Sequence, residues 1–321
     1  MIPQVSTGYM HGDTACLRIG TGPPLVMVMG MTPDHDIPAG WERRMVLSSA
    51  KAFARHFTVY VVKCKRGLKP GESMSDIAGH LAEAIKHDVG EAVRLQGTSS
   101  GGSVALQLSI EHPDLVRRLV VVASAYRLGP RGKALQAEMA ALIRAGRKED
   151  ALPHFMTSMV PAPLRGPIRP LARFATRSMV PTGDMLVLLE AEDAFDVRAD
   201  IQRITAPTLV IGGTKDFNDW RINPLASYIA NVMWHDGESR LTASRTLAAL
   251  SISLILVCHS TSGQSAIEIR FVQRMENPRA DGKGAGNSYL LEGMPPRAPQ
   301  FSASFATSYG DCTHGFFGSD F

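Results

Sequence analysis

Arg94-Leu-Gln-Gly-Thr-Ser-Ser-Gly-Gly-Ser103 is the stretch that decides how this chain folds. It contains one match to the pattern G-x-S-x-G, with Ser99 as the central serine. The residues before it, Ala92 to Gln96, predict a short buried strand, and the residues after it, Gly102 to Glu111, predict a helix. Strand, sharp turn and helix form the context that holds such a serine clear of a sheet. The same pattern also occurs in ordinary turns, so the prediction depends on these flanks.

Buried strands and helices alternate on both sides of this stretch. Leu25 to Met29 is a continuous apolar run, suited to a central parallel strand that is buried on both faces. Helices are predicted from Trp41 to His56 and from Asp76 to His87, with Asp76 as a cap or first-turn charge. Further strands are predicted at Thr14 to Ile19, Thr58 to Val62, Leu119 to Ala123 and Pro207 to Ile211. This alternation predicts an α/β protein with a mostly parallel central sheet flanked by helices.

The alternation stops at about residues 125–204, where the pattern predicts helices without strands. Helices are expected at Lys133 to Ala145, Glu149 to Met159 and around Met185 to Ala194, with a proline-broken stretch before the last one. A helical excursion between two strands of a sheet predicts an inserted helical cap. Its apolar side chains, such as Met139 and Leu188, suit an apolar ligand, and they equally suit packing of the cap onto the core.

Composition argues against several classes of protein. With 321 residues and 45% hydrophobic content, the chain can bury a large core. Its 34 Lys and Arg residues nearly balance 30 Asp and Glu residues without a dense basic run, so no nucleic-acid partner is expected. The four cysteines have no paired spacing, which predicts reduced thiols in a cytoplasmic protein. No signal peptide and no membrane segment are expected.

These residues together resemble the α/β-hydrolase superfamily over roughly Thr14 to Asn231. The resemblance is carried by the Leu25 to Met31 strand and turn, Arg66-Gly67, the Ser99 turn, Leu119 to Ala123, the helical cap and Ala206-Pro-Thr-Leu-Val-Ile-Gly-Gly-Thr-Lys-Asp216. It implies the α/β-hydrolase fold, with residues 1–124 and 205–231 as the core and 125–204 as the cap. The chain departs from the family at Met29, where histidine is frequent, and at Lys63-Cys64-Lys65, where an aspartate is frequent.

The resemblance implies serine hydrolase chemistry, with a triad in the chain order Ser, Asp, His. A serine hydroxyl needs a histidine to accept its proton, and that histidine needs an acidic partner. Ser99 would be the nucleophile, and Asp216, just past a late strand, the acid. The backbone N–H groups of Met31 and Ser100 would bind the oxyanion, each contributing on the order of 3 kcal/mol. Asp216 also fits a solvated turn, and Met31 also fits a gap in the core.

The catalytic histidine is the least determined member of this triad. Family order requires it to follow Asp216, which leaves three candidates, among them His259 and His314. His314 is predicted as the base, because Asp311-Cys-Thr-His-Gly-Phe-Phe317 is similar to the family's terminal segment. His259 ends the apolar run Leu254 to Cys258 and is the alternative base, although it also fits a partly buried histidine at the tip of a strand.

The spacing between the predicted acid and the predicted base departs from the family. In this chain 98 residues separate Asp216 from His314, where family members use one helix, one strand and a turn. Residues 232–309 include Ser- and Thr-rich sequence and clusters of Gly and Pro, which are typical of loops or disorder. We therefore predict an atypical insertion at 232–309, followed by a C-terminal segment at 310–321 that carries the base.

Nothing in the sequence names the substrate. A serine at position 99 argues against the dehalogenase and epoxide hydrolase branches of the family, which use aspartate there. The expected function is cleavage of a carboxylic ester or a related acyl bond in an apolar small molecule through an acyl-enzyme on Ser99. No metal cluster and no dinucleotide fingerprint is seen, so no cofactor is expected. The alternative is a hydrolase-like protein that has lost catalysis and has a binding role.

Overall fold

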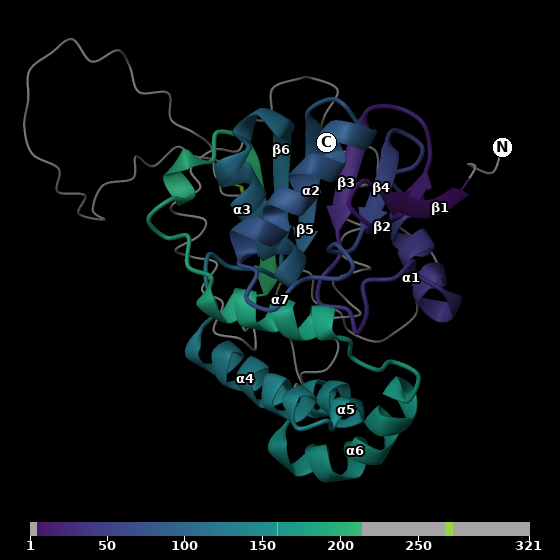
Figure 1. Cartoon of the computed structure of the whole chain (residues 1–321), viewed down its shortest axis with the longest axis vertical. Coiled ribbons are helices and arrows are strands. Elements are labelled where there is room, and N and C mark those ends of the chain that lie inside the picture. Colours follow the sequence, from purple (N-terminus) through teal and green to yellow (C-terminus); the bar gives the residue numbers. More distant parts are fainter. Residues whose placement is uncertain (1–4, 159, 214–266, 272–321) are drawn as a thin grey trace, which may run out of the picture.

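The computed structural model describes residues 5–158, 160–213 and 267–271. Figure 1 shows a sheet covered by helices, with a further group of helices below it. The strands are β1 (Val5–Met10), β2 (Thr14–Ile19), β3 (Pro24–Val28), β4 (Thr58–Val62), β5 (Val93–Thr98), β6 (Val116–Val122), β7 (Thr208–Gly213) and β8 (Ile267–Phe271). The helices of four residues or more are α1 (Gly40–Lys51), α2 (Met74–Asp88), α3 (Ser100–Glu111), α4 (Pro130–Arg144), α5 (Lys148–Ser158), α6 (Ala162–Thr176) and α7 (Gly183–Ala194).

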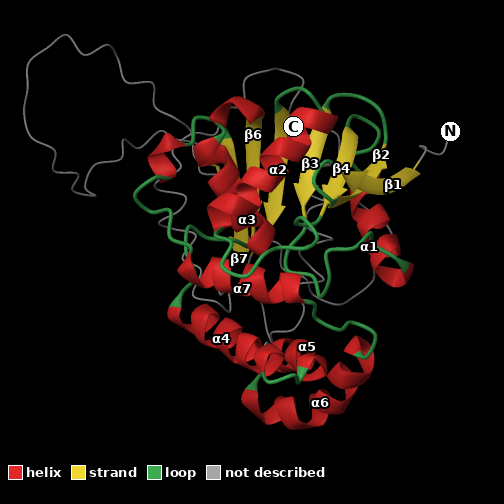
Figure 2. Cartoon of the chain, in the orientation of Figure 1, coloured by secondary structure: helices red, strands yellow, loops and turns green. Residues whose placement is uncertain are grey.

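The strands form one sheet in the order β1-β2-β4-β3-β5-β6-β7-β8. The five central strands, β4, β3, β5, β6 and β7, run parallel to one another. Antiparallel pairs lie at both edges, where β2 joins β1 and β4 and where β8 joins β7. The predicted α/β architecture, a mostly parallel sheet flanked by helices, is confirmed, and Figure 2 shows the layers.

The apolar runs of β3 and β4 are buried on both faces of the sheet. All five residues of each strand are buried, and alternate side chains enter two separate hydrophobic clusters. Val26 and Val28 of β3 pack in the cluster that includes α2 and α3, whereas Leu25 and Met27 pack in the cluster that includes α1. A strand alternates its side chains between faces, so only an uninterrupted apolar run can fill both clusters.

Helix α2 begins two residues earlier than predicted, and its cap is a different residue. Ser73 is the N-cap: its hydroxyl accepts from the Asp76 backbone N–H, and the Asp76 carboxylate accepts from the Ser73 backbone N–H. Asp76 is therefore the first-turn charge, which is one of the two roles predicted for it, and it is the second member of a capping box whose N-cap is Ser73. Because both groups satisfy an otherwise free helix amide, the start of α2 is well defined.

Helices α4 to α7 all lie between β6 and β7 in the chain. The prediction that prolines interrupt the helical structure before the last of these helices is wrong. Residues Ala162–Thr176 form helix α6 even though Pro163, Pro167 and Pro170 lie in it. Pro163 lies in the first turn, where its missing N–H costs nothing. The interior prolines are tolerated because α6 packs along α5, where Ala172 and Thr176 are buried. Tertiary packing therefore outweighs local propensity here.

Two strands were not predicted from the sequence. Val5–Met10 pairs along its whole length with β2, and Ile267–Phe271 pairs with β7. The second of these, β8, lies within the range for which an insertion was predicted; the rest of 232–309 lies outside the described residues. Ile267–Phe271 alternates apolar and charged residues, a period of two that is typical of a strand and was missed. Val5–Met10 lacks such alternation, and it forms a hairpin with β2 across the three residues 11–13. None of the helices in the described part of the chain is long and apolar enough to span a membrane bilayer.

Candidate active site

Ser99 occupies the strained turn between β5 and α3. Its backbone angles are φ 54° and ψ −128°, a conformation that a residue with a side chain rarely adopts. Two backbone hydrogen bonds hold the turn: Ser99 N–H donates to the Val122 carbonyl at 2.9 Å, and Gly102 N–H donates to the Ser99 carbonyl at 2.7 Å. Strain of this kind costs about 1–3 kcal/mol and persists only where the surroundings enforce it. The side chain of Ser99 is only partly buried, so its hydroxyl is accessible.

Three glycines allow this turn and the start of α3 to pack closely against β3 and against the residue that follows β6. A Cβ atom on Gly101 would lie 2.5 Å from the Val28 carbonyl oxygen of β3, and one on Gly102 would lie 2.6 Å from the Ser124 hydroxyl that follows β6. A Cβ atom on Gly97 would lie 2.6 Å from the Gly102 Cα. No real Cβ atom shows such separations, so α3 reaches its position only because its first turn has no side chains there.

The turn after β3 lies directly against Ser99. A Cβ atom on Gly30 would lie 3.0 Å from the Thr98 carbonyl oxygen and 3.1 Å from the Ser99 Cβ, so these backbones are in close contact. The backbone of Met31 follows Gly30, and Ser100 is the first residue of α3, where helix amides have no partner within the helix. The turn that carries one predicted donor thus contacts the predicted nucleophile, and the other predicted donor follows the nucleophile directly. The side chain of Met31 meanwhile packs against the hydrophobic cluster of α4, α5 and α7.

A buried lysine fixes the loop that continues from this turn. The side chain of Lys63 is 1% exposed, and its Nζ lies 3.1 Å from Asp34 Oδ1 and 3.0 Å from Glu42 Oε1. Asp34 lies in the loop after β3, and Glu42 lies in the first turn of α1. Lys63 follows β4, near the place where the sequence departs from the related family. The two ion pairs therefore anchor the loop after Met31 to the end of a central strand.

The remaining members of the predicted triad, Asp216 and His314, lie outside the described residues, as does the alternative base His259. Within the described part of the chain, Ser99 has no hydrogen bond to a histidine ring. His35, for example, is buried with its Nδ1 2.9 Å from the Lys65 carbonyl oxygen, and burial lowers its pKa, so it is neutral at pH 7. The acid and the base stay predictions.

The described residues offer neither a reactive cysteine nor a metal site as an alternative to Ser99. Cys16 and Cys64 are free, and burial raises the pKa of each thiol to about 12. A thiol with such a pKa stays protonated at neutral pH and is a poor nucleophile. No group of three or more His, Cys, Asp or Glu side chains in the described ranges is arranged to hold a metal ion. Ser99 therefore remains the nucleophile candidate.

The sequence did not single out Glu192, which joins the nucleophile helix to the helices beyond the sheet. Glu192 of α7 is 2% exposed. It accepts hydrogen bonds from the Ser103 hydroxyl of α3 at 3.0 Å and from the Gln136 amide of α4 at 2.8 Å. Burial raises the pKa of this carboxyl, and the two hydrogen bonds oppose the rise only in part. A glutamate within a helix ordinarily faces solvent, so no sequence pattern reveals this contact.

Replacing Glu192 with glutamine is expected to stabilise the fold progressively as the pH rises. A carboxyl group whose pKa is raised by folding stabilises the fold fully below its unfolded pKa, near 4.5, and this contribution is lost as the pH rises toward the folded pKa. The loss is about 1.4 kcal/mol for each unit of pKa shift. Glutamine does not ionise, and it can donate to the buried Gln136 Oε1, which has no partner among the described residues. Chemical denaturation of both proteins between about pH 5 and 8 measures the difference.

The matched control for this prediction is Glu190→Gln. Glu190 lies two residues away in α7, is partly exposed, and pairs with Arg144 at 2.5 Å. Removing a pair of this kind changes stability by less than about 1 kcal/mol. If the stability difference between Glu192→Gln and the unmodified chain stays constant across the pH range, then Glu192 is not held at a raised pKa.

The fold has counterparts among solved structures, and part of the sequence resembles a known protein. Over 113 residues the chain is 33% identical to 2-hydroxymuconate semialdehyde hydrolase from Pseudomonas sp. (strain CF600), a match that covers 33% of this chain and 38% of that relative. The crystal structure of an α/β hydrolase from Sphaerobacter thermophilus DSM 20745 matches 78% of this chain and 98% of its own, with 25% identity and a TM-score of 0.52. The enol-lactonase from Burkholderia xenovorans LB400 matches 78% of this chain and 100% of its own, with 19% identity and a TM-score of 0.57. No family model matches the sequence.

Proposed function

Because this chain has the α/β-hydrolase fold, we propose that it is a serine hydrolase that cleaves a carboxylic ester or a related acyl bond through an acyl-enzyme on Ser99. The observation that carries the proposal is the backbone of Ser99, held at φ 54° between β5 and α3 with Gly30 packed against it. A nucleophile at the start of a helix has free amides beside it, and a second amide from the turn after β3 completes an oxyanion site.

In this mechanism the Ser99 hydroxyl attacks the acyl carbon, and the backbone N–H groups of Met31 and Ser100 stabilise the negative charge on the carbonyl oxygen. His314 accepts the serine proton and returns it to the leaving group, and Asp216 orients the imidazole. Water then hydrolyses the acyl-enzyme. The position of Gly30 against Ser99 supports the two-amide arrangement. The roles of the acid and the base are carried by the resemblance in sequence.

The substrate we propose is a small molecule with an apolar acyl group. Support comes from the side chain of Met31, which packs against a cluster of buried apolar residues from the helices beyond the sheet. The members of that cluster are Leu135, Met139, Ala140, Ile143, Ala151, Met185 and Leu189. The predicted oxyanion turn thus contacts apolar side chains through Met31, which favours an apolar group next to the reacting carbonyl.

A fluorophosphonate probe tests the proposal without knowledge of the substrate. Such a probe phosphonylates only an activated serine, so we expect one adduct on the folded chain, located on Ser99 by peptide mass spectrometry. The Ser99→Ala variant and the urea-unfolded protein should remain unlabelled. A folded chain that is not labelled would favour the alternative function, a hydrolase-like protein that binds its ligand without cleaving it.

A further inference from the structure

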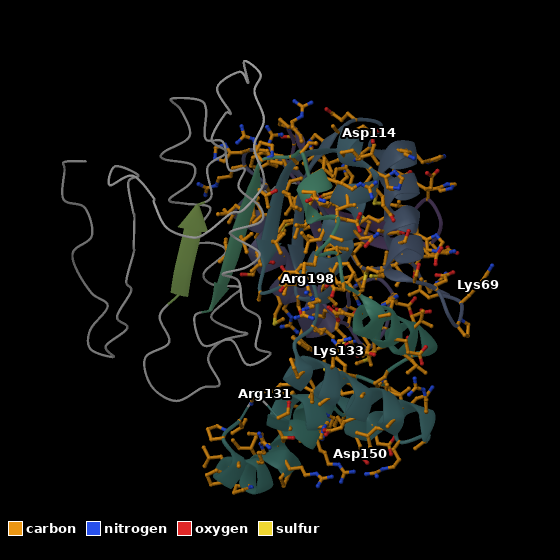
Figure 3. All side chains as sticks on the ribbon, turned by 90° about the vertical axis from the view of Figure 1, so that its left-hand side faces the viewer. Lys69, Asp114, Arg131, Lys133, Asp150 and Arg198 are labelled. Carbon is orange, nitrogen blue, oxygen red and sulfur yellow. The ribbon has the colours of Figure 1, made fainter. Side chains whose placement is uncertain are left out.

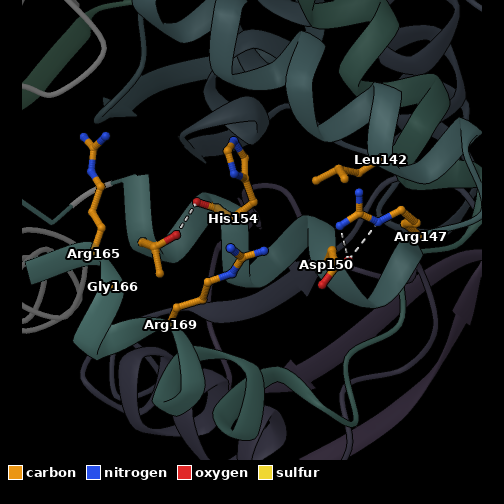
Figure 4. A pocket seen from close by; sticks show the side chains of 8 residues that line it. Leu142, Arg147, Asp150, His154, Arg165, Gly166 and Arg169 are labelled. Carbon is orange, nitrogen blue, oxygen red and sulfur yellow. Dashed lines mark hydrogen bonds and ion pairs between the residues drawn. The ribbon is translucent and has the colours of Figure 1, made fainter. Parts of the chain in front are cut away.

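A pocket with excess positive charge lies within the helices beyond the sheet. Its volume is about 240 Å³. It is lined by Leu142, Arg147, Asp150, His154, Thr157, Arg165, Gly166 and Arg169. Every one of these residues belongs to α4, α5, α6 or the turn between α4 and α5. Figure 3 shows Asp150 in this lower layer of helices, and Figure 4 shows the pocket from close by. None of its lining residues comes from the turns around Ser99, so it is distinct from the candidate active site.

One carboxylate in the pocket is shared by two guanidinium groups. Asp150 is buried, and its Oδ2 accepts from Arg147 Nε at 3.0 Å and from Arg147 Nη2 at 2.7 Å. Its Oδ1 accepts from Arg173 of α6. The hydrogen bonds from Arg147, followed by those from Arg173, lower the pKa of Asp150, so the group is ionised. One negative charge therefore faces two positive charges at this wall, and both carboxylate oxygens are already used.

Two further arginines of α6 add positive charge that no acidic residue in the described part of the chain pairs with. Arg165 is oriented by its Nε, which donates to the Val160 carbonyl at 2.9 Å. Arg169 lines the same pocket and has no hydrogen bond or ion pair with any described residue. Helix α6 contains no Asp or Glu, and the nearby Glu138 is paired with His154 at 2.6 Å. Figure 4 shows the Arg169 side chain directed toward Arg147 and Asp150, with Arg165 one helical turn away along α6.

We propose that this pocket binds a small oxyanion, namely a phosphate-bearing or carboxylate-bearing metabolite. A guanidinium group is planar, remains charged, and donates two parallel hydrogen bonds to such oxygens. Arg169 is exposed and makes no hydrogen bond with a described residue, so its donors are available to such a ligand. Arg165, one turn earlier on α6, donates to the Val160 and Ser158 carbonyls and adds a second positive charge. The volume, about 240 Å³, lies below the roughly 300 Å³ at which sites for drug-sized ligands begin. The ligand is therefore compact, with one or two anionic groups, and contacts α5 and α6 together.

Isothermal titration calorimetry of the full chain at low ionic strength tests this site with two probes, inorganic phosphate and citrate. We expect saturable binding of at least one of them, and the one that binds more tightly identifies the anionic group. Arg169→Gln is expected to raise the Kd by at least about tenfold, because the loss of one hydrogen bond to a charged group weakens binding by that factor or more. The matched control is Arg177→Gln: Arg177 follows the same helix, stacks on Phe174 with 3.9 Å to the ring centroid, and does not line the pocket.

A third variant adds bulk at the pocket rim without changing any charge. Gly166 is exposed and lines the pocket, and a Cβ atom there would have nothing within 4 Å, so Gly166→Leu is accommodated without a clash. Leucine is also the better helix former, so the helix is retained. We expect this variant to lose binding as well, with chloride as the reference salt. The proposal is wrong if neither anion binds at concentrations up to about 10 mM, one order of magnitude weaker than a millimolar site, or if Arg177→Gln weakens binding as much as Arg169→Gln does.

Discussion

Replacing Ser99 with alanine is expected to lower kcat on a short p-nitrophenyl ester by on the order of 10⁵-fold to 10⁶-fold. The hydroxyl is the atom that forms the acyl bond, so no other group in the site substitutes for it. The fold should be retained, because the Ser99 side chain is only partly buried and makes no hydrogen bond with a described residue. We expect the free energy of unfolding to change by less than about 1 kcal/mol. Steady-state kinetics and denaturant unfolding on the same preparation measure both quantities.

The matched control is Ser124→Ala, which makes the same substitution at a nearby buried serine. Ser124 is 1% exposed, its Oγ has no hydrogen-bond partner among the described residues, and it lies beside Gly102 of α3. This variant should retain activity within a few-fold. A buried hydroxyl without a hydrogen bond does not stabilise the fold, so its removal should leave the structure intact. Full activity in Ser99→Ala, or equal loss in both variants, would contradict the role of Ser99.

Replacing Gly101 with alanine is expected to reduce the free energy of unfolding by about 4 kcal/mol or more, among the largest effects of a single substitution. The added methyl group would lie 2.5 Å from the Val28 carbonyl oxygen and also too close to that of Met29. Both are backbone atoms of the strand and turn beneath α3, and backbone of a central strand cannot move aside as a flexible side chain can. The nucleophile turn should therefore distort, and activity should fall together with stability. Urea denaturation followed by circular dichroism gives the loss.

Gly79→Ala is the control for that experiment. Gly79 lies in the middle of α2, and a Cβ atom there would have nothing within 4 Å. The same added methyl group should stabilise the chain by about 0.5–1 kcal/mol, because alanine has the higher helix propensity and restricts the unfolded chain. A loss below about 1 kcal/mol in Gly101→Ala, comparable in size to ordinary surface effects, would show that α3 does not pack on β3 as described.

Much of the fold could be predicted because its signals are local. The runs at Leu25 to Met29 and Thr58 to Val62 are strands in the structure, since apolar residues buried on both faces leave no polar position within the run. The serine turn was predictable for the same reason, because glycine at positions 97, 101 and 102 is required by contacts only a few residues away or on an adjoining strand. Features of this kind can be recognised from the residue types in a short stretch of sequence.

The contacts between distant segments were not predictable. The helix at Ala162–Thr176 forms despite its prolines because α5 packs against it. Glu192 is buried because Ser103 and Gln136, 89 and 56 residues away in the chain, meet it. The shared Asp150 and the free Arg169 likewise become a pocket only when α5 and α6 are placed together.

By itself, then, the sequence determined the α/β alternation, the serine at the end of β5 and the glycines that allow its turn. Only the tertiary structure decided that Gly30 packs against Ser99, that a carboxylate on α7 accepts a hydrogen bond from the nucleophile helix, and that arginines of α6 line a cavity. The physical reason is the separation along the chain of the residues on which each property depends. Burial and backbone geometry depend on neighbours in sequence, whereas hydrogen bonds, ion pairs and cavities depend on which distant surfaces meet, and many sequences with the same local pattern would pair those surfaces differently.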